Sequence, residues 1–499
     1  MISSLELFQS LVKIKKIIFA VQVQLKSKQP IQMKAYKFEI FTNEIEKNIK
    51  NGIFKPGHKL PSVREIKEKY QLSSSTVQMG YEHLLLSGSV ESIPKSGYYV
   101  RNTLSKATPV TGLQKPVIRD AIFSNHLALT TSLRMGRKIS EFNVAAPGDL
   151  IIPQKLLLRT MQQVIREQGA GLLRYYPTSG LLALKDHIAK RAASYYTMIS
   201  TDELLITDGA LQALYIALSA TCERGDVIAL ESPSVFSVLE VIRVLGLKVI
   251  EIPVDPVLGF DVEFFRKAIE VKTIKAVVVT PNFHNPTGTL LSDEKKMLLL
   301  KTAQQHNVAV IENDIYGDLY FSGQRPNTIK SYDESGLVMT YSSYAKTLAP
   351  GIRLGWLSSG KFTERAEQIK FALGSSVSPL YQETVSRLIA GSSYDRHLRS
   401  FRMQLAKNAH FAINLLSAHF PEDIAMATPL GGYNLWVRMP QDIDMKFFYE
   451  LCEEIGVRFT PGSTFSFSAT FDQYFRLVFA DTFTPKRIEA IRQLGKRLS

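Results

Sequence analysis

The stretch Ser343-Tyr-Ala-Lys346-Thr-Leu-Ala-Pro-Gly-Ile-Arg353-Leu-Gly355 places a lysine in a predicted loop, with a serine three residues before it and an arginine seven residues after it. A hydroxyl and a guanidinium on either side of one lysine can hold a phosphate while the lysine amine attacks a carbonyl. The Pro-Gly pair before the arginine turns the backbone sharply enough to bring the two ends of the stretch together. The alternative is a surface lysine beside a turn.

These groups meet the requirements of a pyridoxal 5′-phosphate (PLP) site. The stretch resembles the Schiff-base segment of fold-type I aminotransferases, in which Ser-aromatic-Ser/Ala-Lys is followed by an arginine in this place. The resemblance implies that Lys346 forms the Schiff base and that Ser343 and Arg353 bind the phosphate of PLP.

Length and composition limit the class of protein. A chain of 499 residues is expected to form two or three domains, and 45% apolar and 21% charged residues are typical of a globular protein. The net charge of +14 suits a polyanionic partner, although an enzyme with anionic substrates could also be basic. The two cysteines, Cys222 and Cys452, form no metal or disulfide pattern, which favours the cytoplasm. No apolar run reaches the length of a membrane span.

The segment from Tyr36 to Val100 shows three helical patterns and a hairpin. Apolar spacing predicts a first helix that ends at Gly52, and Ser62 with Glu65 forms a capping box at the start of a second helix. The second helix is expected to end near Tyr70. A third helix begins at Ser74, and two short strands, 90–92 and 98–100, flank a turn.

This segment resembles the winged helix-turn-helix of GntR-type bacterial regulators over about residues 36–101, on Gly57–Ile66, Thr76-Val77 and Ser96–Val100. The resemblance implies binding to a double-stranded DNA operator through phosphates and base edges. The implied DNA-binding residues are Arg64, Ser74, Ser75, Thr76, Lys95 and Ser96. Two usual basic residues are missing, at Ser74 and near Ile93, and Gly80 stands where alanine is common, so the base-reading residues stay open. A helical module without a nucleic-acid role is the alternative.

Beyond Glu141, short apolar strands alternate with helical segments, which predicts an α/β sheet with helices on its faces. The strands include 227–230, 276–280, 308–311 and 338–341. Each ends in polar residues, at the position where open α/β sheets bind ligands.

One strand end leads through Asp208 into a helix. A glycine there lets the backbone N–H groups of Gly209, Ala210 and Leu211 converge on a phosphate, and a plain helix entry is the alternative. Leu211 departs from the Gly-x-Gln-Gln that is common in the aminotransferases.

Two further strand ends carry residues suited to the pyridoxal ring. Asn285, in Asn-Pro-x-Gly, matches the family asparagine that binds the 3′ oxygen, and the Asn285-Pro286 bond is a candidate cis bond. Asp314 and Tyr316 are two residues apart at a strand end, so their side chains are expected to point to the same side of the strand. A carboxylate favours a protonated ring nitrogen, and a phenol can bind the 3′ oxygen.

The resemblance assigns three more residues. Tyr175 matches a tyrosine that enters the neighbouring subunit's phosphate pocket, and Arg476 matches the arginine that pairs with the substrate carboxylate. An aromatic residue usually stacks on the ring after Glu-x-Pro-x, but Val235 stands there and Phe236 comes one position late. Either Phe236 turns in or an aliphatic side chain covers the ring.

The expected organisation has four parts: an N-terminal extension at 1–34, the winged helix at 35–102, a linker at 103–140 and the aminotransferase-like domain at 141–499, with a small subdomain from about 375. An upstream translation start is one explanation of the extension. A helix between Val117 and Leu133 is an open alternative within the linker. The whole resembles the MocR family, which implies a domain-swapped homodimer and a PLP-dependent regulator that senses an amine or amino acid through aldimine exchange at Lys346. The alternative is a PLP-dependent aminotransferase with a 2-oxo acid acceptor.

Overall fold

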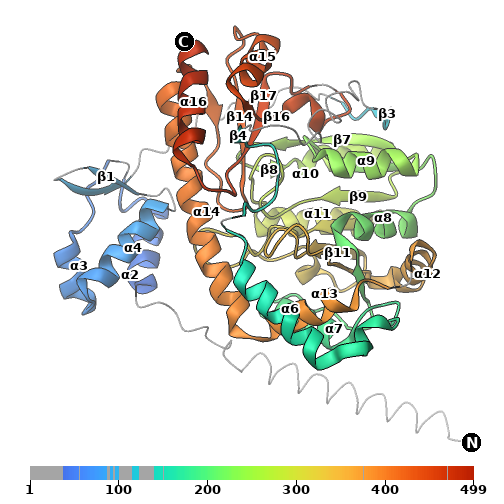
Figure 1. Cartoon of the computed structure of the whole chain (residues 1–499). Helices are drawn as coiled ribbons and strands as arrows, with labels where there is room; N and C mark the ends of the chain where they lie inside the picture. The colour runs from blue at the N-terminus through green and yellow to red at the C-terminus, as the bar shows by residue number, and fades with distance from the viewer. Residues whose placement is uncertain are drawn as a thin grey trace, which may run out of the picture. The chain divides into compact units, whose positions relative to one another are not determined.

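The chain forms two compact units, drawn in Figure 1. One contains residues up to 54 together with 61–81, and the other contains residues 55–60 and 82–499. The computed structural model describes residues 38–55, 57–86, 90–93, 96–100, 115–122, 140–149, 151–374, 376–468 and 470–498. The predicted extension at 1–34, most of the predicted linker and Lys95 lie outside this set.

The three helices of the N-terminal unit lie where the sequence predicts them. They are α2 (Glu39–Lys50), α3 (Val63–Tyr70) and α4 (Ser74–Leu86). The backbone N–H of Glu65 donates to Ser62 Oγ at 3.3 Å, and the N–H of Ser62 donates to the Glu65 carboxylate at 2.5 Å. The predicted capping box is therefore present and fixes the start of α3.

Phe41 organises the core of these helices. Its ring is fully buried and lies 5.7 Å from the ring of Tyr81, centroid to centroid. A Cβ atom at Gly80 would lie 2.2 Å from Cζ of Phe41. The glycine at a position where alanine is common is thus explained by the bulk of Phe41.

A two-stranded hairpin follows α4 in the chain. Strands β1 (Val90–Ile93) and β2 (Gly97–Val100) pair antiparallel, with Val90 opposite Val100. Lys59 forms an isolated bridge with Tyr99. The predicted wing is confirmed within the described residues.

A nine-stranded mixed sheet forms the centre of the large domain (Figure 1). Its order is β3-β7-β6-β9-β10-β11-β12-β5, with β8 paired to β7. The strands from β7 to β11 run parallel, whereas β3 and β12 run antiparallel to their neighbours. Their bounds are β3 (Ile118–Asp120), β5 (Leu204–Thr207), β6 (Val227–Ser232), β7 (Lys248–Asp255), β8 (Gly259–Phe260), β9 (Ala276–Val279), β10 (Ala309–Asn313), β11 (Val338–Ser343) and β12 (Gly355–Ser358).

Helices cover both faces of this sheet, as the runs of apolar residues in its strands require. Ile228 and Leu230 of β6 pack with the helices of one face, while Ala229 between them packs with those of the other. The first face carries α8 (Gly209–Thr221), α9 (Phe236–Leu245) and α12 (Thr363–Leu373). The second carries α10 (Val262–Val271) and α11 (Asp293–Gln305).

The C-terminal part has its own four-stranded sheet, in the order β13-β14-β17-β16. Strand β4 (Ser140–Glu141) pairs with β15 (Val457–Arg458), so the first residues of the large domain lie beside its last part. No helix among the described residues is long and apolar enough to cross a bilayer. The remaining elements are α6 (Gln154–Gln168), α7 (Leu182–Ala193), α13 (Pro379–Ala390), α14 (Ser392–His419), β13 (Ala425–Met426), β14 (Asn434–Arg438), α15 (Met445–Ile455), β16 (Thr460–Pro461), β17 (Tyr474–Val478) and α16 (Pro485–Leu498).

The structure corrects one expectation for the linker. The sequence leaves a helix possible between Val117 and Leu133, but residues Ile118–Asp120 form strand β3, with Ile118 opposite Ile250 of β7. Three residues are too few to show a periodic pattern, and it is backbone pairing with β7 that defines the strand. This part of the predicted linker belongs to the edge of the large sheet.

We expect Gly80→Ala to destabilise the helical unit by about 1–2 kcal/mol. Alanine gains roughly 1 kcal/mol of helix propensity, but overpacking against Phe41 costs about 1–3 kcal/mol. The close approach of the new Cβ atom to the Phe41 ring favours the upper end of this cost. Hydrogen exchange of the α2 and α4 amides in the full chain measures the change. Phe41→Leu should recover part of the loss, and Gly351→Ala, which has open space around it, is the control. Unchanged protection in Gly80→Ala would contradict this packing.

Candidate functional site

The predicted site residues follow β5, β9, β10 and β11. These strands run in one direction, so their carboxyl ends lie at one edge of the sheet, where α/β folds bind ligands. The loops after these strands carry Gly209, Asn285, Asp314 and Lys346. The sheet therefore brings together residues that are far apart in the sequence.

The lysine loop leaves β11 at Ser343 and returns at Gly355. A Cβ atom at Gly355 would lie 2.7 Å from the carbonyl carbon of Gly209 and 2.8 Å from the carbonyl oxygen of Ser342. Only glycine allows this close backbone contact, which brings Arg353 to the start of α8. Ser343 Oγ donates to Leu354 O at 3.1 Å, so its predicted phosphate contact requires the hydroxyl to turn and stays a prediction.

The first turn of α8 and Arg353 form an anion-binding arrangement. Gly209 has a φ of +78°, which suits glycine, and begins the helix after Asp208. Arg353 Nη2 donates to Asp208 O at 3.2 Å, and its side chain remains 52% exposed. The N–H groups of Gly209, Ala210 and Leu211 have no partner within the helix. A phosphate between these groups and Arg353 would meet donors from both sides.

No carboxylate of the described residues pairs with Lys346. Its Nζ donates to Ala145 O at 2.5 Å. Burial, followed by the charges of Arg476 and Arg353, lowers the pKa of Lys346 to about 8. A larger share of this amine is therefore neutral near physiological pH, as a nucleophile requires.

Asn285 and Tyr316, the residues predicted to bind the 3′ oxygen of the ring, contact each other. Asn285 Nδ2 donates to the hydroxyl oxygen of Tyr316 at 3.3 Å, and the Asn285-Pro286 bond is cis. Tyr433 packs edge-on against Tyr316, with centroids 5.0 Å apart, and donates to Ala145 O at 3.0 Å. Asn285 and Tyr316 thus present an amide and a phenol to one point. This point lies beside Ala145 O, which accepts from the Lys346 amine.

Arg476 is buried, with 1% of its surface exposed, and its Nε has no hydrogen-bond partner among the described residues. Its other nitrogens donate to Asn285 Oδ1 at 3.0 Å, Asn143 O at 2.6 Å and Thr460 Oγ1 at 3.1 Å. Burial lowers the pKa of Arg476 to about 10. Because its protein partners are neutral oxygens, this guanidinium is suited to bind an anion.

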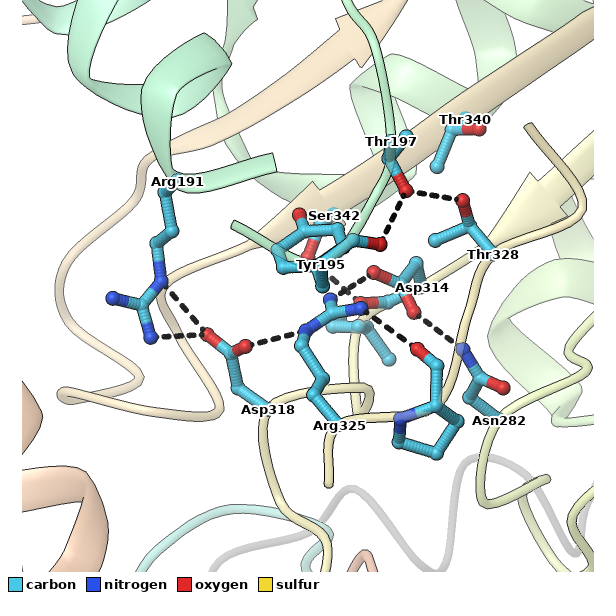
Figure 2. Close-up of polar contacts among 12 residues, drawn as sticks. Arg191, Tyr195, Thr197, Asn282, Asp314, Asp318, Arg325, Thr328, Thr340 and Ser342 are labelled. Carbon is cyan, nitrogen blue, oxygen red and sulfur yellow. Dashed lines mark hydrogen bonds and ion pairs between the residues drawn. The ribbon is translucent and has the colours of Figure 1, made fainter. Parts of the chain in front are cut away.

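Asp314 follows β10 and is held on both sides. Asn282 Nδ2 donates to its Oδ1 at 3.0 Å, and Arg325 forms an ion pair with its Oδ2 (Figure 2). Sequence reasoning missed Arg325, because a single arginine in a loop without apolar periodicity carries no signal of its partner.

Phe236 is the first residue of α9, and its ring lies 6.0 Å from the ring of Phe465 and 6.0 Å from the Arg476 guanidinium. Val235 caps this helix and packs in the core beside α8 and α9. Tyr175 is 92% exposed, and its role in a neighbouring subunit stays a prediction.

The predicted DNA-binding residues lie at the ends of the N-terminal helices and in the hairpin. Ser74 and Ser75 are exposed in the first turn of α4, where the N–H of Thr76 donates to Ser73 Oγ at 3.1 Å. Arg64 Nε lies 3.1 Å from the carboxylate of Glu68, and Ser96 Oγ lies 2.6 Å from the Tyr99 hydroxyl. Lys95 is outside the described residues. Their contacts with DNA stay predictions.

The chain matches two family models. Residues 42–100 match the gntR family of bacterial regulatory proteins, and residues 148–494 match aminotransferase class I and II. It is 30% identical over 467 residues to the uncharacterized HTH-type transcriptional regulator YjiR of Escherichia coli (strain K12), over 92% of this chain and 98% of YjiR. The chain belongs to the HTH-type transcriptional regulators that carry an aminotransferase class I and II domain. This confirms the family that the sequence resembles.

Further relatives support the two parts of this regulator. It is 28% identical over 412 residues to the HTH-type transcriptional regulator NorG of Staphylococcus aureus (strain USA300), covering 81% of this chain and 92% of NorG. A kynurenine aminotransferase of Pyrococcus horikoshii, solved with PMP, matches with a TM-score of 0.70 and 25% identity, over 76% of this chain and 95% of that structure. LysN of Thermus thermophilus, an α-aminoadipate aminotransferase, matches with a TM-score of 0.69 and 23% identity, over 74% of this chain and 94% of LysN. The predicted fold is confirmed.

We expect the Lys346 amine to react with an acylating reagent with a pH midpoint near 8, because burial and two guanidiniums disfavour its protonated form. Arg476→Met should move this midpoint to higher pH by removing one positive charge. Peptide mass spectrometry of the labelled, PLP-free protein follows Lys346 separately from Lys370, whose pKa is also lowered to about 8 by burial. Arg402→Met, which removes another buried guanidinium, is the control. An equal midpoint in wild type and Arg476→Met would contradict the electrostatic account.

Proposed function

We propose that this regulator binds PLP at Lys346, binds a DNA operator through its winged helix, and changes its operator affinity when an amine or amino acid replaces Lys346 on the cofactor. One observation carries the proposal. A single chain joins a gntR-type domain to an aminotransferase class I and II domain that carries the residues proposed to hold PLP and an amino acid. The groups are Gly209, Asn285, Asp314, Tyr316, Lys346, Arg353 and Arg476.

The residues present fit PLP. The glycine at the start of α8 and Arg353 suit its phosphate and Asn285 and Tyr316 suit its 3′ oxygen, while Asp314, the residue predicted for its ring nitrogen, is held by Asn282 and Arg325. When bound, PLP supplies an aldehyde carbon that reacts with primary amines and a ring that withdraws electrons. Lys346 would supply the amine for that carbon, and its lowered pKa would leave a larger share of this amine in the neutral, reactive form.

Arg476 favours effectors that carry a carboxylate. Its guanidinium is buried and its Nε has no hydrogen-bond partner in the described part of the chain. A bound carboxylate would satisfy this donor and offset the cost of the buried charge. An amino acid therefore suits the site better than a simple amine.

Two copies of the chain are expected to assemble as a domain-swapped homodimer. Tyr175 projects into solvent with 92% of its surface exposed, and Leu173 beside it is 89% exposed. A neighbouring subunit would bury both and place Tyr175 at its phosphate. A two-fold dimer also suits an operator with two half-sites. Because its target is chromosomal DNA, we place its action in the cytoplasm.

The linker strand offers a route by which the site can influence DNA binding. Arg119 of β3 lies with its Nε 3.6 Å from the carboxylate of Glu251 on β7. Glu251 is buried and accepts from Ser466 Oγ at 2.8 Å and from the N–H of Phe467 at 3.1 Å. A strand in the connection between the two domains is thus tied to the loop at 462–468.

The same loop touches the effector side of the site. The ring of Phe465 lies 5.1 Å from the Arg476 guanidinium, and Phe465 O accepts from the N–H of Ser234 at 2.7 Å. When Arg476 binds a carboxylate, any movement of Phe465 reaches Ser466 directly. Arg476, Phe465, Ser466, Glu251 and Arg119 form a continuous series of contacts that supports a coupled response.

Operator affinity should depend on the effector by a coupling of about 1–3 kcal/mol, and DNA should change effector affinity equally. Genomic fragments selected by the protein are titrated with and without PLP and with a panel of amino acids and amines. Lys346→Ala should lose the response because exchange with the cofactor is blocked. Arg476→Ala should lose it only for effectors with a carboxylate.

Borohydride reduction followed by peptide mass spectrometry should label Lys346 and no other lysine. The outcome against the proposal is equal DNA affinity in all ligand states together with sustained transfer of amino groups to a 2-oxo acid. That result would identify an aminotransferase.

Arg119→Ala and Glu251→Gln should each reduce the effector response at least about fivefold, while PLP binding and effector-free DNA binding stay unchanged. The reason is that both remove the ion pair between Arg119 of β3 and Glu251, the residue that accepts hydrogen bonds from the loop at 462–468. The double variant should lose no more than either single variant, because one interaction is removed. Arg266→Ala, which breaks surface ion pairs on α10, is the control. A full response in both variants would exclude this route.

A further inference from the structure

Strand β14 carries a polar side chain at a buried position. Its residues from Asn434 to Val437 are all buried, and the three after Asn434 are apolar. Asn434 is 1% exposed, and its Oδ1 accepts no hydrogen bond from the residues that the structure describes. A buried amide without its partners costs free energy, and an apolar residue at this position would avoid that cost. A polar group kept in such a place is a candidate for binding a ligand.

The small sheet places Asn434 on the face that carries Arg476. Trp436 of β14 lies opposite Arg476 of β17, and it packs with Phe465, whose ring lies 5.1 Å from the Arg476 guanidinium. Leu435 faces the other side of the sheet and packs in the main apolar core. Residues two apart on a strand point to the same side, so Asn434 and Arg476 are diagonal neighbours on one face.

The Asn434 amide also lies near Tyr316. Burial raises the pKa of Tyr316, while the Asn434 amide and the charge of Arg476 oppose this rise. An amide acts on a phenol in this way only at hydrogen-bonding range. Tyr316 accepts from Asn285 Nδ2 at 3.3 Å, and Asn285 Oδ1 accepts from Arg476 at 3.0 Å. Asn434, Tyr316, Asn285 and Arg476 therefore form one polar cluster on the effector side of the site.

Two atoms of this cluster lack partners, and they are opposite in type. Arg476 Nε is a charged donor and Asn434 Oδ1 is a neutral acceptor, and neither forms a hydrogen bond within the described part of the chain. A carboxylate satisfies the first, whereas an O–H or N–H group satisfies the second. In the proposed function, the α-amine of an amino acid reacts with the cofactor. The donor for Asn434 therefore has to come from the side chain of the amino acid.

We propose that Asn434 is a specificity-determining residue whose amide oxygen accepts a hydrogen bond from the side chain of an amino-acid effector held by Arg476. The inference rests on the proposed function and adds a ligand class to it. The class is amino acids whose side chain carries a hydroxyl, amide or ammonium group. An aliphatic amino acid leaves the buried acceptor unsatisfied, and a site built to hydrogen-bond its ligand discriminates strongly against such an analogue.

The test uses pairs of amino acids of similar shape that differ in one donor. The pairs are L-threonine with L-valine, L-serine with L-2-aminobutyrate, and L-lysine with L-norleucine. Each is titrated into the full-length chain loaded with PLP and freed of excess PLP, and the concentration at half of the change in cofactor absorbance is measured. In the wild type, the donor-bearing member of at least one pair should bind about tenfold or more tightly than its partner.

Two substitutions of Asn434 separate lost recognition from general damage. Asn434→Leu should remove the preference by weakening the donor-bearing member alone, whereas general damage weakens both members of a pair equally. Asn434→Asp keeps acceptor oxygens and adds a negative charge, so it should favour L-lysine over L-norleucine more strongly than the wild type does. The aspartate variant also decides the matter if the leucine variant does not fold.

Asn408→Leu is the matched control. Asn408 is a buried asparagine of α14 whose amide donates to Phe479 O at 2.9 Å and accepts from Gln404 at 2.8 Å. Its polar contacts lie outside the cluster around Asn434, so this variant should keep the wild-type preference.

The outcomes separate this inference from the proposed function. If the wild type responds to amino acids but binds both members of every pair equally, the inference is wrong and the proposed function stands. A preference that Asn434→Leu retains, or that Asn408→Leu removes as fully, also overturns it. If no amino acid of the panel changes the cofactor absorbance and borohydride labels no lysine, the proposed function itself fails and this inference fails with it.

Discussion

Arg476 is buried and Lys346 is partly buried in a site where no carboxylate of the described residues pairs with either. Removing positive charge from water is costly, and the lowered pKa values of both groups record that cost. Backbone carbonyls and the side-chain oxygens of Asn285 and Thr460 accept hydrogen bonds from these two cations and hold them in place without neutralising their charge. The domain is stable enough to maintain this unfavourable charge, and the charge gives it affinity for anionic ligands.

Negative charge is placed behind the site. Asp314, Asp318 and Asp395 alternate with Arg325 and Arg191 in a series that is buried at Asp314 and partly exposed at Asp395. This series leads from the end of β10 to α14, and α14 also contacts the lysine loop because the Tyr394 hydroxyl donates to Thr347 Oγ1 at 2.9 Å. The lysine and the aspartate are therefore supported by one connected set of side chains.

Much of this arrangement could be predicted from the sequence. Gly209, Asn285, Asp314 and Lys346 stand directly after apolar strands, and parallel strands bring their carboxyl ends to one edge, so local pattern was enough to bring them together. The capping box of α3 could be predicted for the same reason, because its two residues, Ser62 and Glu65, are close together in the sequence. Arg325, Glu251 and strand β3 could not be predicted in this way. Their roles come from partners that are distant in sequence, and no spacing rule connects Arg119 with Glu251 or Arg325 with Asp314.

Strand β3 also sets the length of free chain between the two domains. If residues 101–139 were all unattached, they could extend roughly 130 Å. Because β3 is anchored on β7, only residues 101–117 separate the hairpin from a fixed point on the sheet, a reach of roughly 60 Å. That reach is an upper limit on the distance between the hairpin and the sheet of one chain. In the proposed homodimer, it would also limit how far apart two operator half-sites can lie.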